Sequence, residues 1–297
     1  MNSPSAVPQV FDRALQKRRL ARAKARGAED FLLLRVVEDM AARRDATLRP
    51  FPRVLDLGTP GPQAAAMLAQ RPQGNIGERT ILRAAPVPET ADPRWQTVVV
   101  DEESLPFAAE SFDLAISALA LQWVNDLPGV LLQIRRALAP DGLFLACLMG
   151  GQTLQELRAV FAQAEEEITG GASPRVAPFA DLRDMGALLQ RAGFALPVTD
   201  IDTVTVRYAD IFALMADLRA MGATNVLVHR LKKPLRRAAL LRAAEIYAQQ
   251  FCDPDGRIRA TFEIVWLSGW APHESQQKPL KPGSARMRLA DALGKTE

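Results

Sequence analysis

The sequence predicts an α/β protein with a three-layer, doubly wound sheet, mostly parallel with one antiparallel strand, and a helical cap. Two observations support this fold class. In the first half of the chain, short apolar runs alternate with helical patterns, as in a parallel sheet whose strands are buried on both faces. Beyond Gly151, longer helical patterns are interrupted by two strand patterns in which apolar and polar residues alternate.

Composition fits one large globular domain and excludes several classes of protein. The 297 residues are 48% hydrophobic and 24% charged, so the chain is neither disordered nor fibrous. A net charge of +3 and an aromatic content of 6% offer little to nucleic acid, and we expect no nucleic-acid partner. The only histidines are His229 and His273, and Cys147 and Cys252 are far apart, so we expect no metal site.

The sequence gives no sign of a membrane-spanning helix. No apolar run reaches the roughly 18 residues that such a helix needs, and basic side chains precede any apolar signal core. We therefore expect no transmembrane segment and a cytoplasmic location. Peripheral contact with the inner face of a membrane stays open, because a strongly basic helix is expected before Gly27. The alternative is that its cations form a solvated face.

The first part of the chain divides into two regions. Region 1–50 is the N-terminal basic and helical segment, and its second helix, at 30–42, has apolar residues at helical spacing. Region 51–150 forms the first half of the sheet. Its strands are expected at 53–57, 79–83, 97–100, 113–117 and 143–149, with helices at 63–70 and 127–138.

The second half of the sheet, with its cap, is expected over 151–271. Helical patterns cover 153–168, 182–192, 210–221 and 234–251, and alternating strands cover 199–208 and 260–270. The helices within 209–251 lie between these two strands, so we expect them to cap the sheet rather than form a separate domain. The tail, 272–297, is rich in proline and expected to be irregular.

Four short motifs together resemble the class I S-adenosylmethionine-dependent methyltransferases. They are Val54-Leu55-Asp56-Leu57-Gly58, Leu105-Pro106-Phe107, Ser111-Phe112-Asp113 and Leu138-Ala139-Pro140-Asp141-Gly142, in the family's order and spacing. The resemblance implies that 51–150 is a methyltransferase-like, nucleotide-binding half and that S-adenosylmethionine is the cofactor. The cofactor-binding residues that it implies are Asp56, Gly58, Gly61, Asp101, Glu102 and Leu119.

The loop after the first strand departs from the family pattern. An acidic residue followed by alternating glycines is usual, but Pro60 and Pro62 stand where the second and third glycines belong. Proline fixes φ and removes an N–H donor, so we expect weakened cofactor binding. Gly61 offers partial relief, and Pro62 suits the first turn of the following helix.

The other two cofactor determinants differ in how well they are preserved. Counting about 20 residues from Gly58 reaches Glu78, which precedes the expected second strand instead of following it. No acid appears at the end of that strand. Asp101 and Glu102 follow the third strand, where the resemblance implies a carboxylate that contacts adenine. The alternative is an ordinary polar strand exit.

Three longer stretches resemble a narrower family, the mitochondrial complex I assembly factor of this superfamily and its alphaproteobacterial relatives. They cover 121–128, 150–158 and 273–276. This resemblance implies maturation of respiratory complex I by hydroxylation of an arginine in one of its subunits. Relatives in biotin synthesis, which methylate a malonyl group on a carrier protein, share the shorter motifs only.

These stretches contain the candidate residues for binding a substrate or partner protein. They are Trp123, Asn125, Asp126, Gly151, Glu156, His273 and Glu274. If they meet at one pocket, Asp126, Glu156 or Glu274 could receive a guanidinium group. The alternatives are helix capping by Asn125 or Asp126 and a tight turn at Gly151.

Three functions stay open at this point. The first is a complex I maturation factor, possessing enzyme activity toward an arginine of a protein subunit. The second is an S-adenosylmethionine-dependent methyltransferase of a small or carrier-bound acid. The third is a non-catalytic chaperone, which Pro60 and Pro62 favour because they weaken the cofactor site.

Overall fold

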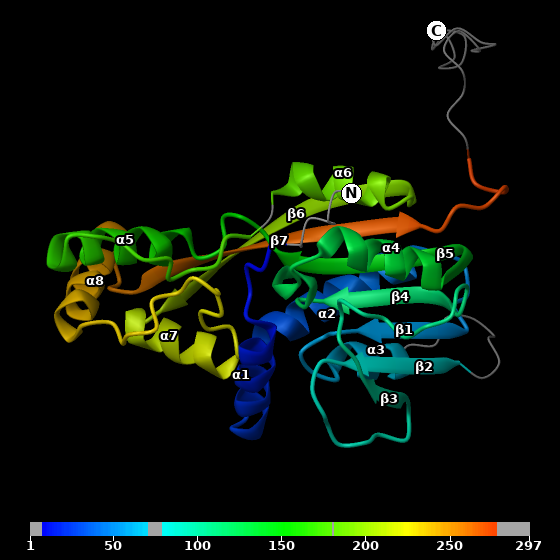
Figure 1. The fold of residues 1–297 in the computed structure, drawn as a ribbon, viewed down its shortest axis with the longest axis horizontal. Helices are drawn as coiled ribbons and strands as arrows, with labels where there is room; N and C mark the ends of the chain where they lie inside the picture. Colours follow the sequence, from blue (N-terminus) through cyan, green and yellow to red (C-terminus); the bar gives the residue numbers. More distant parts are fainter. Residues whose placement is uncertain (1–7, 71–78, 180, 278–297) are drawn as a thin grey trace, which may run out of the picture.

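The computed structural model describes residues 8–70, 79–179 and 181–277, so Glu78 and most of the predicted tail lie outside the described residues. Its centre is a seven-stranded sheet in the order β3-β2-β1-β4-β5-β7-β6 (Figure 1). The strands are β1 (Arg53–Leu57), β2 (Thr80–Ala85), β3 (Gln96–Val99), β4 (Phe112–Ala118), β5 (Leu138–Met149), β6 (Ala195–Tyr208) and β7 (Ile258–Trp270).

The helices lie on both faces of this sheet and beyond one of its ends (Figure 1). They are α1 (Arg13–Ala25), α2 (Phe31–Asp45), α3 (Gln63–Gln70), the short 3-10 helix η1 (Leu121–Trp123), α4 (Leu127–Ala137), α5 (Gln155–Thr169), α6 (Leu182–Arg191), α7 (Ile211–Ala220) and α8 (Arg237–Gln250). None of the helices in the described parts of the chain has both the length and the apolar character needed to cross a bilayer.

The predicted fold class is confirmed. Strands β1 to β5 pair in parallel, and β7 is inserted antiparallel between β5 and β6. The bounds of β1 and α3 agree with the sequence expectation. Strand β5 begins at Leu138 instead of 143, because Leu138 already pairs with Phe112 before a register shift.

Strands β6 and β7 are both longer than predicted and also pair with each other beyond the end of β5. Strand β6 begins at Ala195 instead of 199, beside the part of β7 that pairs with β5, and β7 begins at Ile258 instead of 260, in the part that pairs only with β6. Strand β5 pairs with β7 only between Ile264 and Trp270, whereas β6 pairs with β7 as far as Ile258. Residues 258–263 and their partners on β6 therefore form a two-stranded arm. Helices α5 and α8 pack against each other on this arm, and α7 lies between it and α1 (Figure 1).

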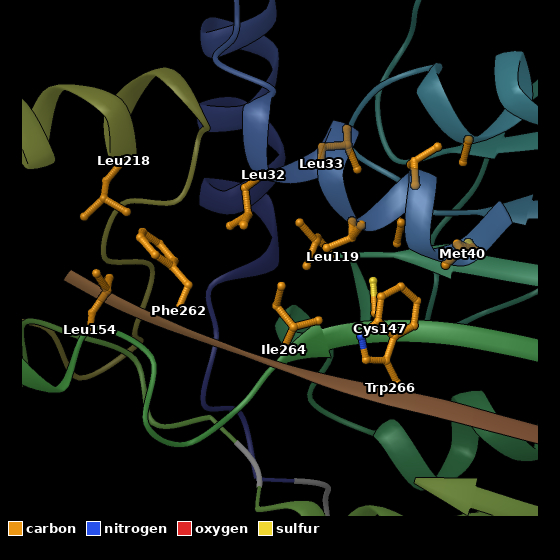
Figure 2. Packing of buried hydrophobic residues seen from close by; sticks show 14 of the residues in the cluster. Leu32, Leu33, Met40, Leu119, Cys147, Leu154, Leu218, Phe262, Ile264 and Trp266 are labelled. Carbon is orange, nitrogen blue, oxygen red and sulfur yellow. The ribbon is translucent and has the colours of Figure 1, made fainter. Parts of the chain in front are cut away.

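One continuous apolar cluster joins the sheet to the arm (Figure 2). Cys147 of β5 lies beside Trp266 of β7, and the cluster continues along β7 through Ile264 and Phe262 to Leu218 of α7. The Trp266 ring also lies 4.3 Å from the Arg43 guanidinium carbon. Because the cluster has no break at the arm, the cap shares the core of the sheet.

Candidate functional site

A cavity of about 440 Å³ lies at the carboxyl edge of the parallel strands. This is the edge where ligands bind in open α/β sheets, and the volume is within the usual range for a small-molecule site. Its walls come from α1, α2, the loops after β1, β2, β4 and β5, and the turn after α7. The lining residues are Gln16, Leu20, Lys24, Ala28, Glu29, Asp30, Leu32, Leu33, Pro60, Gly61, Pro62, Gln63, Glu89, Thr90, Trp95, Leu119, Gln122, Trp123, Met149, Met221, Gly222 and Ala223.

The loop after β1 forms one wall of this main cavity. Gly58 has a φ of +71°, and a Cβ there would lie 3.0 Å from the Glu102 Cγ, so only glycine fits without strain. Pro60, Gly61 and Pro62 line the cavity directly. The Pro62 carbonyl accepts a hydrogen bond from the Ala66 N–H at 2.8 Å, which joins the loop to α3. The two prolines leave this wall poorer in N–H donors than a loop of alternating glycines.

Asp56 lies beneath this loop and does not line the main cavity. Its carboxylate forms a fully buried ion pair with Arg83, with 2.6 Å between Oδ2 and Nη1, and accepts a hydrogen bond from the Thr59 hydroxyl. Arg83 also donates to the Thr59 carbonyl at 2.9 Å and pairs with Glu89. In this structure Asp56 joins β1 to β2 and to the loop, and the cofactor-binding role expected for it stays a prediction.

Glu89 is the acid that follows β2, and sequence reasoning missed it. Strand β2 extends to Ala85, and the carboxylate appears four residues later, in the wall of the main cavity. Lys24 of α1 lies 3.0 Å from it. Burial alone would raise the pKa of Glu89, but Arg83 and Lys24 outweigh burial and lower it. A strand boundary placed two residues later would have directed attention to this carboxylate.

Helix α1 covers Asp101 and Glu102, so neither carboxylate lines the main cavity. Arg13 pairs with both, and Lys17 lies 3.0 Å from Asp101. Burial opposes ionisation of Asp101. A hydrogen bond from the Glu103 N–H, together with the cations Lys17 and Arg13, outweighs burial and lowers the pKa of Asp101 to about 2. In this structure both carboxylates are paired with cations of α1. The adenine-contacting role expected for Asp101 and Glu102 stays a prediction.

Leu119 and Trp123 do line the main cavity, as expected from their place after β4. Leu119 has a φ of +50°, an unusual value for a side-chain-bearing residue. The Trp123 ring packs edge-to-face against Phe11 at 5.6 Å and against Phe179 at 5.8 Å. Trp123 therefore lines the main cavity and also packs against the N-terminal segment and the 175–179 loop.

The polar side chains of Asn125 and Asp126, next to Trp123, form hydrogen bonds with backbone groups and do not line the main cavity. The Asn125 Oδ1 accepts hydrogen bonds from the Val10 and Phe11 N–H groups, both at 2.8 Å, and its Nδ2 donates to the Phe11 carbonyl at 3.2 Å. Asp126 caps α4 by accepting from the Gly129 N–H at 2.9 Å. The capping alternative thus accounts for Asp126, and Asn125 fixes the N-terminal segment.

Two further predicted partner residues also have structural contacts. Glu156 is buried and accepts hydrogen bonds from the N–H and hydroxyl of Thr261, which attaches α5 to β7. Gly151 lies after β5, outside the lining of the main cavity, and its carbonyl accepts from Arg158 at 3.4 Å.

His273 and Glu274 lie at the opposite edge of the sheet from the main cavity. They follow the end of β7, which is antiparallel, so Trp270 pairs with Leu143 near the beginning of β5. Both side chains are exposed, and the nearby Gln276 donates to Asp141 at 2.9 Å. The structure thus does not bring 273–276 to the main cavity, and a role of His273 and Glu274 in partner binding stays a prediction.

Three glutamine side chains in the wall of the main cavity have unsatisfied oxygens. The Oε1 atoms of Gln16, Gln63 and Gln122 are buried and have no hydrogen-bond partner among the described residues. The amide nitrogen of Gln63 donates to Asp30 and that of Gln122 donates to the Leu119 carbonyl, both at 2.8 Å. These contacts fix the orientation of each amide, so its oxygen is the atom left without a partner. Buried acceptors of this kind fit a ligand that brings several N–H or O–H donors.

The charged residues of the main cavity reinforce this preference. Glu29, Asp30 and Glu89 face one lysine, Lys24, which is already paired with Glu89. S-adenosylmethionine carries ribose hydroxyls and amino groups that match such acceptors, so the residues fit that cofactor apart from the proline-interrupted loop. No group of three potential metal-binding side chains occurs within the described ranges.

The fold and the site together define a class I methyltransferase-type protein. The sequence profile of the family described as "Methyltransferase domain" matches residues 55–146. The solved structure of the YcgJ protein from Bacillus subtilis superimposes with a TM-score of 0.53 at 14% identity, covering 80% of this chain and 99% of that chain. At this identity the likeness establishes the fold.

Curated relatives define the family more narrowly. The mitochondrial arginine-hydroxylase NDUFAF5 of Danio rerio is 39% identical over 95% of this chain and 89% of its own length. The Homo sapiens protein of the same name is 40% identical over 96% of this chain and 84% of its own length. The chain belongs to this arginine-hydroxylase family. A malonyl-[acyl-carrier protein] O-methyltransferase from Halorhodospira halophila is 33% identical over 94% of this chain and 95% of its own length.

Proposed function

We propose that this protein hydroxylates an arginine side chain in a subunit of respiratory complex I and thereby serves the assembly of that complex. The observation that carries the proposal is the 39–40% identity to arginine hydroxylases over nearly the whole chain. The identity extends beyond the methyltransferase domain at 55–146 to α1, the arm and its helices. Of these parts, α1 contributes Gln16, Leu20 and Lys24 to the wall of the main cavity.

The acidic side of the main cavity supports an arginine substrate. Glu29 is exposed, lines the cavity and has no ion pair with a described residue. Asp30, beside it, is partly buried and accepts one hydrogen bond from Gln63. A guanidinium group has five N–H donors in a planar fork, so neighbouring carboxylates can orient it while the adjoining apolar wall receives its methylene groups.

Gln16, Gln122 and Glu89 are the residues proposed to hold S-adenosylmethionine, by accepting hydrogen bonds from its hydroxyl and amino groups. When bound, this cofactor supplies a sulfonium methyl group. We expect the affinity to be lower than in relatives with alternating glycines, because Pro60 and Pro62 offer no N–H to the cofactor's carboxylate.

The proposed reaction replaces an arginine C–H bond by C–OH. One oxygen atom of O₂ enters the product, and the other leaves as water after receiving two electrons and two protons from an external two-electron donor of the reduced nicotinamide or flavin class. The chain's own part is to bind the guanidinium through Glu29 and Asp30 and to exclude water with Trp95, Leu119 and Trp123.

A second candidate function is methyl transfer to the carboxyl group of a carrier-bound acid. The observation that favours it is the 33% identity to a malonyl-[acyl-carrier protein] O-methyltransferase over 95% of that protein. The two reactions give different products, because hydroxylation adds an oxygen atom to arginine and esterification adds a methylene unit to a carboxyl group. A non-catalytic chaperone would give neither.

The test is deletion of the gene in a host that relies on complex I, followed by mass spectrometry of the complex I subunits. We expect an arginine to lose one oxygen atom in the deletion strain and to regain it with the wild-type gene. The double variant Glu29→Gln with Asp30→Asn should not restore it, whereas Glu38→Gln with Glu166→Gln, at exposed positions outside the cavity, should. Unchanged arginine masses and normal NADH-dehydrogenase activity in the deletion strain would overturn the proposal.

The location expected from the sequence stays a prediction. The animal relatives are named as mitochondrial. Cell fractionation of the host, with and without a high-salt wash of its membranes, separates a freely dissolved protein from one held at the membrane face.

A further inference from the structure

A second hollow, of about 380 Å³, lies between α1 and α7 and is strongly basic. Arg19 and Arg22 come from α1, Arg26 follows the end of that helix, and Arg219 comes from the last turn of α7. The rest of its lining is small or neutral and consists of Ala23, Gly27, Ala216, Ala220 and Thr224. We call this hollow, with its four arginines, the arginine cleft. Its lining contains no carboxylate among the described residues.

No ion pair joins an arginine of the cleft to a carboxylate within the described residues. Arg22, Arg26 and Arg219 are exposed. Arg19 donates to the Asn225 carbonyl, a neutral acceptor. Burial and repulsion from Arg230 and Arg22 lower the pKa of Arg19. Bringing like charges together costs free energy, and an anionic ligand would recover it.

A third hollow lies between the arginine cleft and the main cavity and shares wall residues with each. This apolar cavity, of about 210 Å³, lies between α5, α7 and the 175–179 loop. Arg219 and Thr224 line both it and the arginine cleft. Trp123 and Ala223 line both it and the main cavity. Because each neighbouring pair shares lining residues, the three hollows lie next to one another, in the order arginine cleft, apolar cavity and main cavity.

The walls of the apolar cavity indicate what could occupy this middle hollow. Leu154, Leu157, Phe161, Met215 and Leu218 are among its lining residues. Its other arginine, Arg175, is already paired with the buried Glu165. An extended segment with acidic residues at one end and an apolar side chain next to them would complement both hollows.

We propose that the arginine cleft and the apolar cavity dock an acidic segment of the protein substrate, which places its target side chain at the main cavity. This inference deepens the proposed function and rests on it for the identity of the substrate. Arginine binds carboxylates through paired N–H donors, which gives such a cleft a preference for Asp and Glu side chains. A concave cleft next to an apolar cavity fits a peptide segment better than a flat lipid surface.

The docking is tested by fluorescence anisotropy with a fluorescein-labelled oligoglutamate peptide, which needs no turnover. We expect the wild type to bind it and to lose affinity as salt is raised. Arg22→Glu with Arg219→Glu should weaken binding at least about tenfold. The matched control is Arg136→Glu with Arg191→Glu, which changes the charge equally at exposed positions on α4 and α6 and should leave affinity unchanged.

Equal weakening in both double variants would mean that only net charge matters and would overturn the proposal. Binding to phosphatidylglycerol vesicles that depends on Arg22 and Arg219, without binding of the peptide, would overturn it in favour of a membrane surface. Circular dichroism checks that each variant is folded. Lysine at both positions should retain part of the affinity, because it keeps the charge and loses the paired geometry.

A second readout separates this inference from the proposed function. With hydroxylation of an isolated complex I subunit as the assay, Arg22→Glu with Arg219→Glu should raise KM and leave kcat nearly unchanged. If no hydroxylation occurs in any variant while peptide binding stays selective, the proposed function fails and the docking site stands. If hydroxylation occurs with an unchanged KM in this double variant, the docking site fails.

Discussion

The Arg83 guanidinium and the Asp56 carboxylate form an ion pair at 2.6 Å in which neither side chain has any exposed surface. Asp56 is the next-to-last residue of β1, and Arg83 is its partner in register on the parallel strand β2. Arg83 also contacts Glu89 in the wall of the main cavity. A single residue therefore ties two strands to the cavity, and this defines the first prediction.

Replacing Arg83 by methionine should lower the free energy of unfolding by about 3–5 kcal/mol, because it leaves Asp56 buried without its counter-charge. The double variant Arg83→Met with Asp56→Asn should lose less than the sum of the single changes. Urea denaturation followed by circular dichroism measures both. Arg94→Met, which removes a partly exposed pair with Asp92, serves as the control and should change little. Additive losses would show that the two side chains are not coupled.

The pairing of Asp101 with α1 predicts a pH dependence. Its pKa is lowered to about 2, so it contributes stability above its unfolded pKa of about 3.9 and loses that contribution as the pH falls toward 2. The difference in unfolding free energy between the wild type and Asp101→Asn should be constant at pH 5 to 7 and shrink between about pH 4 and 2. Since Asp101 is half exposed, the difference should be small, about 1 kcal/mol after solvent screening. A difference that grows on acidification would contradict this.

Asn125 is predicted to hold the N-terminal segment in place. Asn125→Ala removes the acceptor for two N–H groups, of Val10 and Phe11, and should cost about 1–3 kcal/mol. Hydrogen exchange in a peptide covering Val10 to Arg19 should become faster. Asp126→Ala is the matched control, because it removes a cap from α4 and should accelerate exchange there instead. Equal exchange near Phe11 in both variants would assign Asn125 no special role.

Gln16 tests whether the unsatisfied oxygens of the main cavity bind the cofactor. Gln16→Leu should weaken binding of S-adenosylhomocysteine about tenfold, equal to one lost hydrogen bond. Isothermal titration calorimetry measures the affinity. Gln152→Leu, at an exposed position outside the cavity, should bind as the wild type does. Wild-type affinity in Gln16→Leu would place the ligand elsewhere.

The proline-interrupted loop gives the opposite expectation. Pro60→Gly with Pro62→Gly restores two N–H donors to the wall of the main cavity and should tighten S-adenosylhomocysteine binding about fivefold, net of the added flexibility. The same variant should unfold at a lower urea concentration, because glycine adds freedom to the unfolded chain. Weaker binding would show that the prolines shape the loop favourably.

The sequence predicted the fold well because the signals for its elements are local. The apolar run of β1 and the helical spacing of α3 gave the observed bounds. The start of β6 was missed because residues 195–198 contain Pro197 and a register shift, which interrupt the alternating pattern. The start of β7 was missed because Ile258 and Arg259 pair only with β6, beyond the end of β5. Patterns within one strand contain no information about such pairing.

The site was predicted less well because its walls depend on contacts between distant residues. Sequence reasoning treated the cations of α1 as a solvated or partner-facing surface, whereas Arg13 and Lys17 pair with Asp101. The position of His273, away from the main cavity, could have been predicted. An antiparallel β7, which the sequence did predict, must carry the residues after it to the edge opposite the main cavity.

The position of β7 between β5 and β6 also affects the order in which the chain can fold during synthesis. Strand β5 is apolar on both faces, and one edge of it stays unpaired until residues 264–270 have been made. Throughout the synthesis of α5 to α8, the nascent chain therefore exposes a strand edge able to pair with other chains. Completion of β7 closes that edge, so translation pauses before residue 264 prolong the period of greatest aggregation risk.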